Sequence, residues 1–204
     1  MSVTLSGCVT SRGLVTLQSP QHMAQTENLK KTAIIQVIED DRQFENKPKT
    51  PNIPSLKGGL AHASAQDKAK AIARKRNSYG QALGDILLRE GTVSSTVQTR
   101  IENALNQAGY KVITNTSPQQ SADVVISVHV NKFWSWMEIG VWSIKLNTEI
   151  ETEMNLQNNS QNIVTQTKVT TPLAMVTGSA WIKNTNHALD DYENKLITQL
   201  KQIQ

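Results

Sequence analysis

Cysteine is almost absent from this sequence, because its 204 residues include only one, Cys8. A single cysteine excludes an intramolecular disulfide, a CxxC redox pair and every zinc site that needs two or more thiolates. The four histidines lie too far apart in the sequence to form a local pair of metal ligands. We therefore expect no metal site and no cofactor.

Long hydrophobic runs are absent as well. No stretch approaches the roughly eighteen consecutive apolar residues of a membrane-spanning helix, so we expect no transmembrane segment. The net charge of +4 is only mildly basic, and aromatic residues make up 4% of the chain. Because nucleic-acid binders cluster their basic residues and often interleave them with aromatics, we expect no nucleic-acid partner.

The sequence also lacks catalytic signatures. It contains no Gly-rich phosphate loop, no nucleophile elbow and no recognisable triad. Glu149, Glu151 and Glu153 face the same way on an expected strand, where solubility alone would place them. We predict that the protein is not an enzyme. A hydrolase would require a cleft in which a carboxylate and a hydroxyl lie within reach of His129.

Two segments have the apolar period of amphipathic helices. The first covers residues 93–108, where apolar residues recur every four positions and Gly109 can end the helix. The second covers residues 187–203, in which Leu189, Tyr192, Leu196 and Leu200 share one stripe. Both helices should bury that stripe against a common layer.

Two segments, residues 122–134 and 141–156, alternate apolar and polar residues as half-buried strands do. Three further β-prone runs are expected as strands: residues 32–41, 110–114 and 163–177. We predict an α+β fold, in which the two helices pack on one face of an antiparallel sheet of about four to five strands. Residues 32–204 would form this single domain.

A segment rich in proline and glycine interrupts the domain at about residues 45–78. Pro48, Pro51 and Pro54 are followed by Gly58 and Gly59, which break both helices and strand ladders. We expect a long excursion that ends in a basic run. Five cations in this run could form an ordinary solvated face or contact an anionic surface such as lipid headgroups: Lys68, Lys70, Arg74, Lys75 and Arg76.

Three of the four tryptophans lie within nine residues: Trp134, Trp136 and Trp142. They flank an expected hairpin at one end of the sheet. In one interpretation they fill the core beneath the helices. In the other they form an exposed anchor for a membrane interface or a protein partner, which makes them candidate partner-binding residues.

The stretch LSGC, residues 5–8, matches the lipobox of bacterial lipoproteins, in which a diacylglycerol is attached to the cysteine. We therefore predict that Cys8 is lipidated, that residues 1–8 are a signal remnant and that polar residues 9–31 are a flexible tether. The segment before Cys8 lacks the basic start and apolar core of a secretory signal. If Cys8 is lipidated, we therefore expect either that Met1 is not the true first residue of the translated protein or that the chain has been trimmed.

The layout resembles the YajG-type lipoproteins of Gram-negative envelopes over residues 32–203. The phrases that carry the resemblance are RNSYGQALGDILL, ALNQAGYKV, ADVVISVHVNKFW and SIKLNTEIETEMNL, together with the lipobox and the terminal helix. The Pro-rich excursion departs from that pattern. The resemblance implies a small α+β domain on an outer-membrane lipid anchor at Cys8, and it implies no catalytic residue.

The functional prediction is a lipid-anchored accessory protein that binds partners in an envelope complex. Because Val9 follows the cysteine in place of aspartate, the usual sorting rule predicts the periplasmic face of the outer membrane. The alternative is a module that handles or transports lipid or glycolipid. An apolar groove between helices and sheet would favour this alternative, whereas a solid core would favour the accessory protein.

Overall fold

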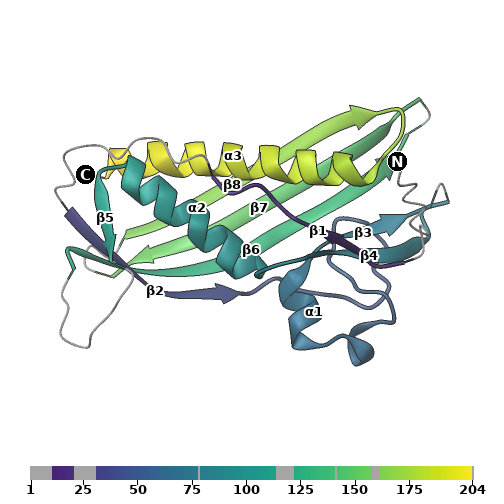
Figure 1. Ribbon diagram of the computed structural model, residues 1–204, viewed down its shortest axis with the longest axis horizontal. Helices are drawn as coiled ribbons and strands as arrows, with labels where there is room; N and C mark the ends of the chain where they lie inside the picture. Colours follow the sequence, from purple (N-terminus) through teal and green to yellow (C-terminus); the bar gives the residue numbers. More distant parts are fainter. Residues whose placement is uncertain are drawn as a thin grey trace, which may run out of the picture.

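The computed structural model describes residues 11–20, 31–77, 79–113, 122–140, 142–157 and 161–203. These residues form one mixed sheet with two long helices on one face (Figure 1). The elements in chain order are β1 (Gly13–Val15), β2 (Lys31–Asp40), a short 3-10 helix (Leu60–His62), α1 (Ala65–Lys70), β3 (Ala71–Arg76), β4 (Ala82–Leu88), α2 (Val93–Gln107), β5 (Tyr110–Ile113), β6 (Val124–Ile139), β7 (Ile144–Leu156), β8 (Gln161–Leu173) and α3 (Gly178–Gln202). Among the described residues, no helix combines the length and the apolar character that crossing a bilayer requires.

The long strand β6 is the centre of the sheet. On one side it pairs with β7 in an antiparallel ladder, and β7 pairs in turn with β8. On its other side the first half of β6 pairs with β2 in parallel, and Ser135 in the second half pairs in parallel with Ala73 of β3. β5 extends the sheet beyond β2, whereas β4 and β1 extend it beyond β3. One edge of β6 therefore pairs with two different strands, β2 along its first half and β3 along its second half.

The predicted fold class is wrong in the number of strands and in their pairing. Within the described residues the sheet has eight strands, and parallel pairs join β2 to β6 and β2 to β5. Alternation shows which face of a strand is buried, but it does not reveal the direction of its neighbour. Strands β3 and β4 lie in or next to the expected excursion, where short runs beside prolines and glycines hid them.

The expected tether is also wrong over residues 11–20. Gly13–Val15 form β1, which adds to the edge of β4 in parallel with Gly13 opposite Ile86. Beyond β1, Leu17 packs against the main core, and the Gln18 N–H donates to Oδ1 of Asn186 in α3. Backbone pairing at a sheet edge can order a segment that has few apolar residues. The signal remnant and residues 9–10 and 21–30 of the expected tether lie outside the described residues, whereas Lys31 begins β2.

The first predicted helix is confirmed as α2. Thr92 and Ser95 form a capping box at its start, in which each side chain accepts a hydrogen bond from the other residue's backbone N–H. The second helix, α3, starts at Gly178, well before the apolar stripe that predicted it. Its first turns bury polar residues that a hydrophobic period does not detect. Asn184, for example, donates to Thr148 and accepts from Thr171.

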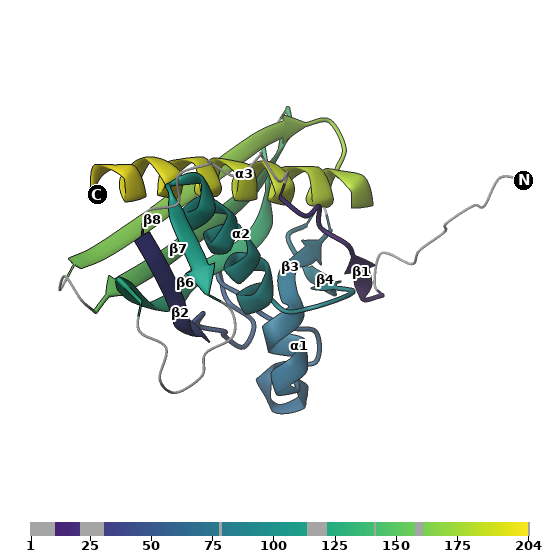
Figure 2. The ribbon, with the colours of Figure 1, turned by 60° about the vertical axis from the view of Figure 1, so that its left-hand side comes forward.

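Two separate apolar clusters lie on the two faces of the sheet. The larger lies between the sheet and helices α2 and α3, where Ile101, Leu105, Tyr192 and Leu196 are fully buried. The smaller cluster lies on the other face, beneath the segment that follows β2. Figure 2 shows the neighbouring α1 on the side of the molecule away from α3. The excursion therefore gives the sheet a second, partial layer.

Candidate functional site

Trp134 and Trp136 form the centre of the smaller cluster. The pairing of β6 with β7 shifts register between Val130 and Lys132, so Asn131 is an extra residue in the ladder. Val130 and Phe133 consequently both face the helices, and the two tryptophans face away from them. They are 2% and 3% exposed. Both are thus buried, although beneath the Pro-rich segment and not beneath the helices.

The two indole rings are fixed by polar and aromatic contacts. Trp134 donates from Nε1 to the Pro51 carbonyl oxygen at 3.1 Å and meets the Phe44 ring edge-on at 6.1 Å. Trp136 donates from Nε1 to Glu138 at 2.8 Å, and the Lys168 ammonium lies 5.2 Å from its ring centroid. These contacts leave the ring positions little freedom.

Arg42 fastens the excursion to the sheet. Its guanidinium is buried and donates to three backbone carbonyl oxygens, those of Lys68, Ala71 and Phe133, at 2.6–3.1 Å. It also forms two hydrogen bonds with the Asp40 carboxylate, at 2.7 and 2.8 Å. Charge-assisted bonds of this kind are about twice as strong as neutral ones. No sequence pattern indicated this role of Arg42.

A cavity of about 320 Å³ lies between the Pro-rich segment and the tryptophan face of the sheet. We call it the Trp groove, and its lining residues are Gln43, Glu45, Asn52, Ile53, Pro54, Asn131, Lys132, Trp134, Trp136 and Glu149. The two walls come from segments that are unrelated in the sequence, one from the excursion and one from strands β6 and β7. The fold brings these walls together.

One wall of the Trp groove is charged. Lys132 lies 2.9 Å from both Glu149 and Glu151. The hydrogen bond to Glu151, followed by that to Glu149, raises the pKa of Lys132. Burial acts to raise the pKa of Glu149, but hydrogen bonds from Lys132 and Gln166 outweigh it and lower that pKa. The groove therefore combines an aromatic floor with a wall on which the side chains of Lys132 and Glu149 are both ionised.

Trp142 lies apart from the other two tryptophans. It is in the turn between β6 and β7 and is 95% exposed. Alternation placed it on the buried face, but the strand begins only at Ile144, after the turn in which the Gly140 N–H donates to the Ser143 carbonyl. The three predicted binding residues thus separate into two in the groove and one at the tip of a hairpin.

The five basic residues of the expected loop lie in α1 and β3. Lys68 and Lys70 are in α1, whereas Arg74, Lys75 and Arg76 are in β3. Several of them bond within the domain: Arg74 donates to the Leu83 carbonyl, and burial lowers the pKa of Arg74. Lys75 donates to the Ser11 carbonyl and Arg76 to that of Gly80. The structure does not gather the run into one loop face.

His129 lies beside two carboxylates on the polar face of the sheet. Its Nδ1 lies 2.7 Å from Asp41 Oδ2 and 3.4 Å from Glu39 Oε2, and all three side chains reach solvent. Imidazole and carboxylate groups are ligands that divalent transition metals accept. The sequence could not indicate this trio, because β2 and β6 are paired only in the fold.

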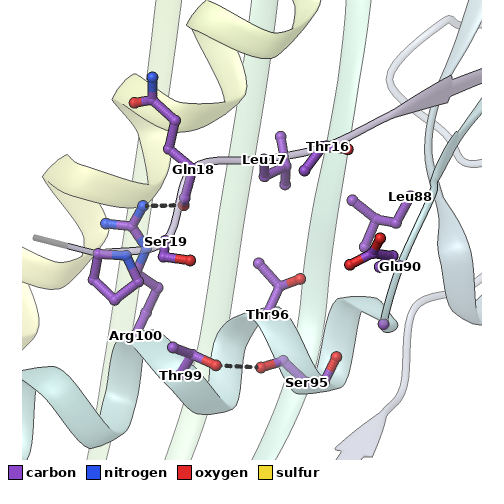
Figure 3. Close-up of a pocket in the computed structure, with 12 residues that line it drawn as sticks. Thr16, Leu17, Gln18, Ser19, Leu88, Glu90, Ser95, Thr96, Thr99 and Arg100 are labelled. Atoms are coloured by element: carbon purple, nitrogen blue, oxygen red, sulfur yellow. Dashed lines mark hydrogen bonds between the residues drawn. The ribbon is translucent and has the colours of Figure 1, made fainter.

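A second cavity, of about 300 Å³, lies between residues 16–20 and the start of α2. Figure 3 shows the Gln18 carbonyl bonded to Arg100 at one end of it, with Thr96 and Thr99 along the helix wall. Its lining is mostly small and polar. Cys8, the predicted lipidation site, lies outside the described residues.

Comparisons with known proteins place the chain in a family. A search of curated proteins found no match. Among solved structures, the chain is similar to an uncharacterized protein, at 12% identity, a TM-score of 0.47 and coverage of 95% of this chain and 99% of the other. It is also similar to a Xanthomonas campestris protein of the family DUF330, at 11% identity, a TM-score of 0.49 and the same coverage. The model of a family described as uncharacterized lipoprotein matches residues 62–202, which is more than half of the chain, and the chain therefore belongs to that lipoprotein family.

Proposed function

We propose that the protein is a YajG-type lipoprotein anchored by a lipid on Cys8 to the periplasmic face of the outer membrane. In this role it acts as an accessory component that binds an envelope protein and performs no catalysis. Membership of a lipoprotein family supports the anchor. The residue after the cysteine, Val9, supports sorting to the outer membrane.

The Trp groove is the observation that carries the binding role. Its floor is aromatic, and aromatic residues in desolvated pockets contribute most to binding energy at protein interfaces. Its volume of about 320 Å³ is at the lower end of the roughly 300–1,000 Å³ range of ligand sites. A groove of this size fits one or two apolar side chains of a partner segment.

The rim of the groove supplies partners for the backbone of such a segment. Gln43 and Asn52 are exposed at its edge and carry amide groups that can both donate and accept. The ionised Glu149 can accept from a donor that enters along the charged wall. The proposed occupant is therefore a short extended segment of an envelope protein, with an apolar side chain on the tryptophan floor.

The alternative of lipid handling has less support. A protein that handles lipid would need an apolar groove between the helices and the sheet that is wide enough for an acyl chain. That space holds the larger cluster, in which Ile101, Leu105, Ile126 and Ile150 are fully buried. A filled core favours the accessory protein over a carrier of lipid.

The proposal is tested by site-specific photo-crosslinking in cells that express the full-length gene product. A photoreactive residue at Asn52, on the groove rim, should capture one envelope protein. The same residue at Lys201, exposed near the end of α3, is the control and should not. Ile53→Arg, which places a charge in the groove, should abolish capture at position 52 without loss of folding.

Equal capture at positions 52 and 201, or capture unaffected by Ile53→Arg, would contradict the binding role of the groove. Native mass spectrometry of the purified chain tests the alternative function of lipid handling. A stoichiometric lipid that survives purification would favour lipid handling over partner binding.

A further inference from the structure

Large apolar side chains are exposed on three turns of the structure. We call them the apolar tip: Tyr79 in the β3–β4 turn, Ile139 and Trp142 at the β6–β7 turn, and Met175 between β8 and α3. Their exposed fractions are 88%, 44%, 95% and 72% in that order. Exposed apolar residues grouped together indicate a contact surface, whereas scattered ones need no explanation.

Strand directions place these turns at one end of the sheet. β3 runs parallel to β6, with Ala73 opposite Ser135, so the turns that follow the two strands point the same way. Ile144, at the start of β7, pairs with Leu173, which brings the end of β8 beside the β6–β7 turn. In Figure 1 the three turns lie together at the right-hand end of the long axis.

The start of the described chain lies at the same end. β1 runs parallel to β4, so its first residue points toward the β3–β4 turn from which β4 departs. Just before β1, the Ser11 carbonyl accepts a hydrogen bond from Lys75 in β3 at 3.1 Å. Cys8 precedes Ser11 by three residues, and three residues span at most about 10 Å. A lipid on Cys8 would therefore enter the bilayer close to the apolar tip.

Basic residues accompany the apolar tip. Arg76 precedes the β3–β4 turn, Lys145 follows the β6–β7 turn and pairs with Pro172, and Lys183 is exposed in the second turn of α3. Glu138 is the acidic residue that pairs with Lys145. Tryptophan, tyrosine and basic side chains are the residues that favour the interface between lipid headgroups and acyl chains.

We propose that the apolar tip docks on the surface of the bilayer that holds the lipid anchor, with Trp142 at the depth of the headgroups. This inference rests on the anchor at Cys8. It gives the domain one orientation, in which the β6–β7 turn faces lipid and the end of α3 points away from the membrane (Figure 1). A single lipid-linked residue would otherwise leave the domain free to rotate.

The test attaches the anchor chemically, so that it does not depend on acylation in cells. Cys8 is the only cysteine, and a maleimide-linked phospholipid can therefore be coupled to it alone. The coupled full chain is placed on vesicles of phosphatidylethanolamine and phosphatidylglycerol in which part of the lipid is brominated near the headgroup. Brominated lipid quenches a tryptophan only at contact.

Docking predicts that brominated lipid quenches part of the tryptophan emission and that Trp142→Ser abolishes this quenching. Trp134→Phe should leave it unchanged, because Trp134 is buried under the excursion. Lys145→Glu combined with Lys183→Glu should reduce it on the anionic vesicles. Absence of quenching, or quenching unchanged in Trp142→Ser, overturns the proposal, and a protein partner would then be the better candidate occupant of the tip. Failure of crosslinking at Asn52, by contrast, would count against the Trp groove alone.

Discussion

Arg100 in α2 donates from its guanidinium to the carbonyl oxygen of Gln18, with 3.2 Å between the two atoms. The same guanidinium lies 3.0 Å from Glu193 and 2.6 Å from Asp190, both in α3. Arg100 therefore joins the N-terminal segment to two helices. An N-terminal strand and this junction hold residues 11–20 on the domain, so the proposed lipid anchor at Cys8 would be separated from the described part of the chain by residues 9 and 10 alone.

Arg100→Ala should destabilise the domain by about 3–5 kcal/mol, because it removes one partner of a buried ion pair. Among the described residues, Glu193 would keep the amide donors of Asn103 and Gln107 and no cationic one. Urea denaturation measures this loss, and limited proteolysis should show earlier cleavage within residues 11–20. Arg89→Ala, at an exposed arginine, is the control and should change stability by less than about 0.5 kcal/mol. Equal stability of the two variants would contradict the role of the junction.

The three tryptophans of β6 and the β6–β7 turn should respond differently to truncation. Trp134→Ala and Trp136→Ala should each cost about 3–5 kcal/mol, because both rings are buried against Leu56 and Leu87. Trp142→Ala should change stability by less than about 0.5 kcal/mol, because its side chain is in solvent. Thermal melts of the three variants measure the difference. A uniform loss would mean that the β6–β7 turn is packed more tightly than described.

Arg42→Lys should loosen the excursion, since a lysine cannot reproduce the forked hydrogen bonds to Asp40 and to the backbone. We expect a loss of about 3 kcal/mol, because each hydrogen bond of a charged group contributes about 1.5–3 kcal/mol. Near-ultraviolet circular dichroism should also change, since Phe44, which stacks with Arg42 in the segment after β2, packs edge-on against Trp134 of β6. An unchanged spectrum would show that the excursion is held by other contacts.

Local patterns predicted the parts of the fold that depend on local chemistry. The four-residue apolar period and the terminating Gly109 identified α2, and alternation identified the buried face of β7 from Leu146 to Leu156. The early turns of α3 were missed because buried Asn184 and Thr185 bond to sheet residues, which a hydrophobic pattern treats as exposed.

The Trp groove could not be predicted, because it depends on two tertiary events. The extra residue Asn131 turns the tryptophans away from the helices, and a bulge has no reliable sequence signal. Arg42 then holds the Pro-rich segment over that face. Sequence analysis identified the aromatic residues and the excursion, but not that they meet.

The stability of the domain should fall in acid partly through Asp191. The pKa of Asp191 lies below its ordinary value of 3.8, chiefly because the Thr167 hydroxyl donates to its carboxylate and also because of nearby Lys195. A carboxyl group of lowered pKa stabilises the folded state above the ordinary pKa, and this contribution is lost as pH falls through the folded value. Between about pH 5 and pH 2, Asp191→Asn should therefore lose less stability than the unchanged chain. Parallel urea-midpoint curves for the two proteins would contradict this coupling.

Fractionation of cells that express the full-length gene product tests the lipid anchor at Cys8 most directly. The unchanged protein should be found in the outer-membrane fraction and should carry acyl chains detectable by mass spectrometry, because two or three chains hold a protein on a bilayer almost permanently. Cys8→Ser should leave the fold unchanged and release the protein into the soluble periplasmic fraction. Equal distribution of the two proteins between membrane and soluble fractions, with no acyl mass on Cys8, would contradict the anchor and with it the proposed function.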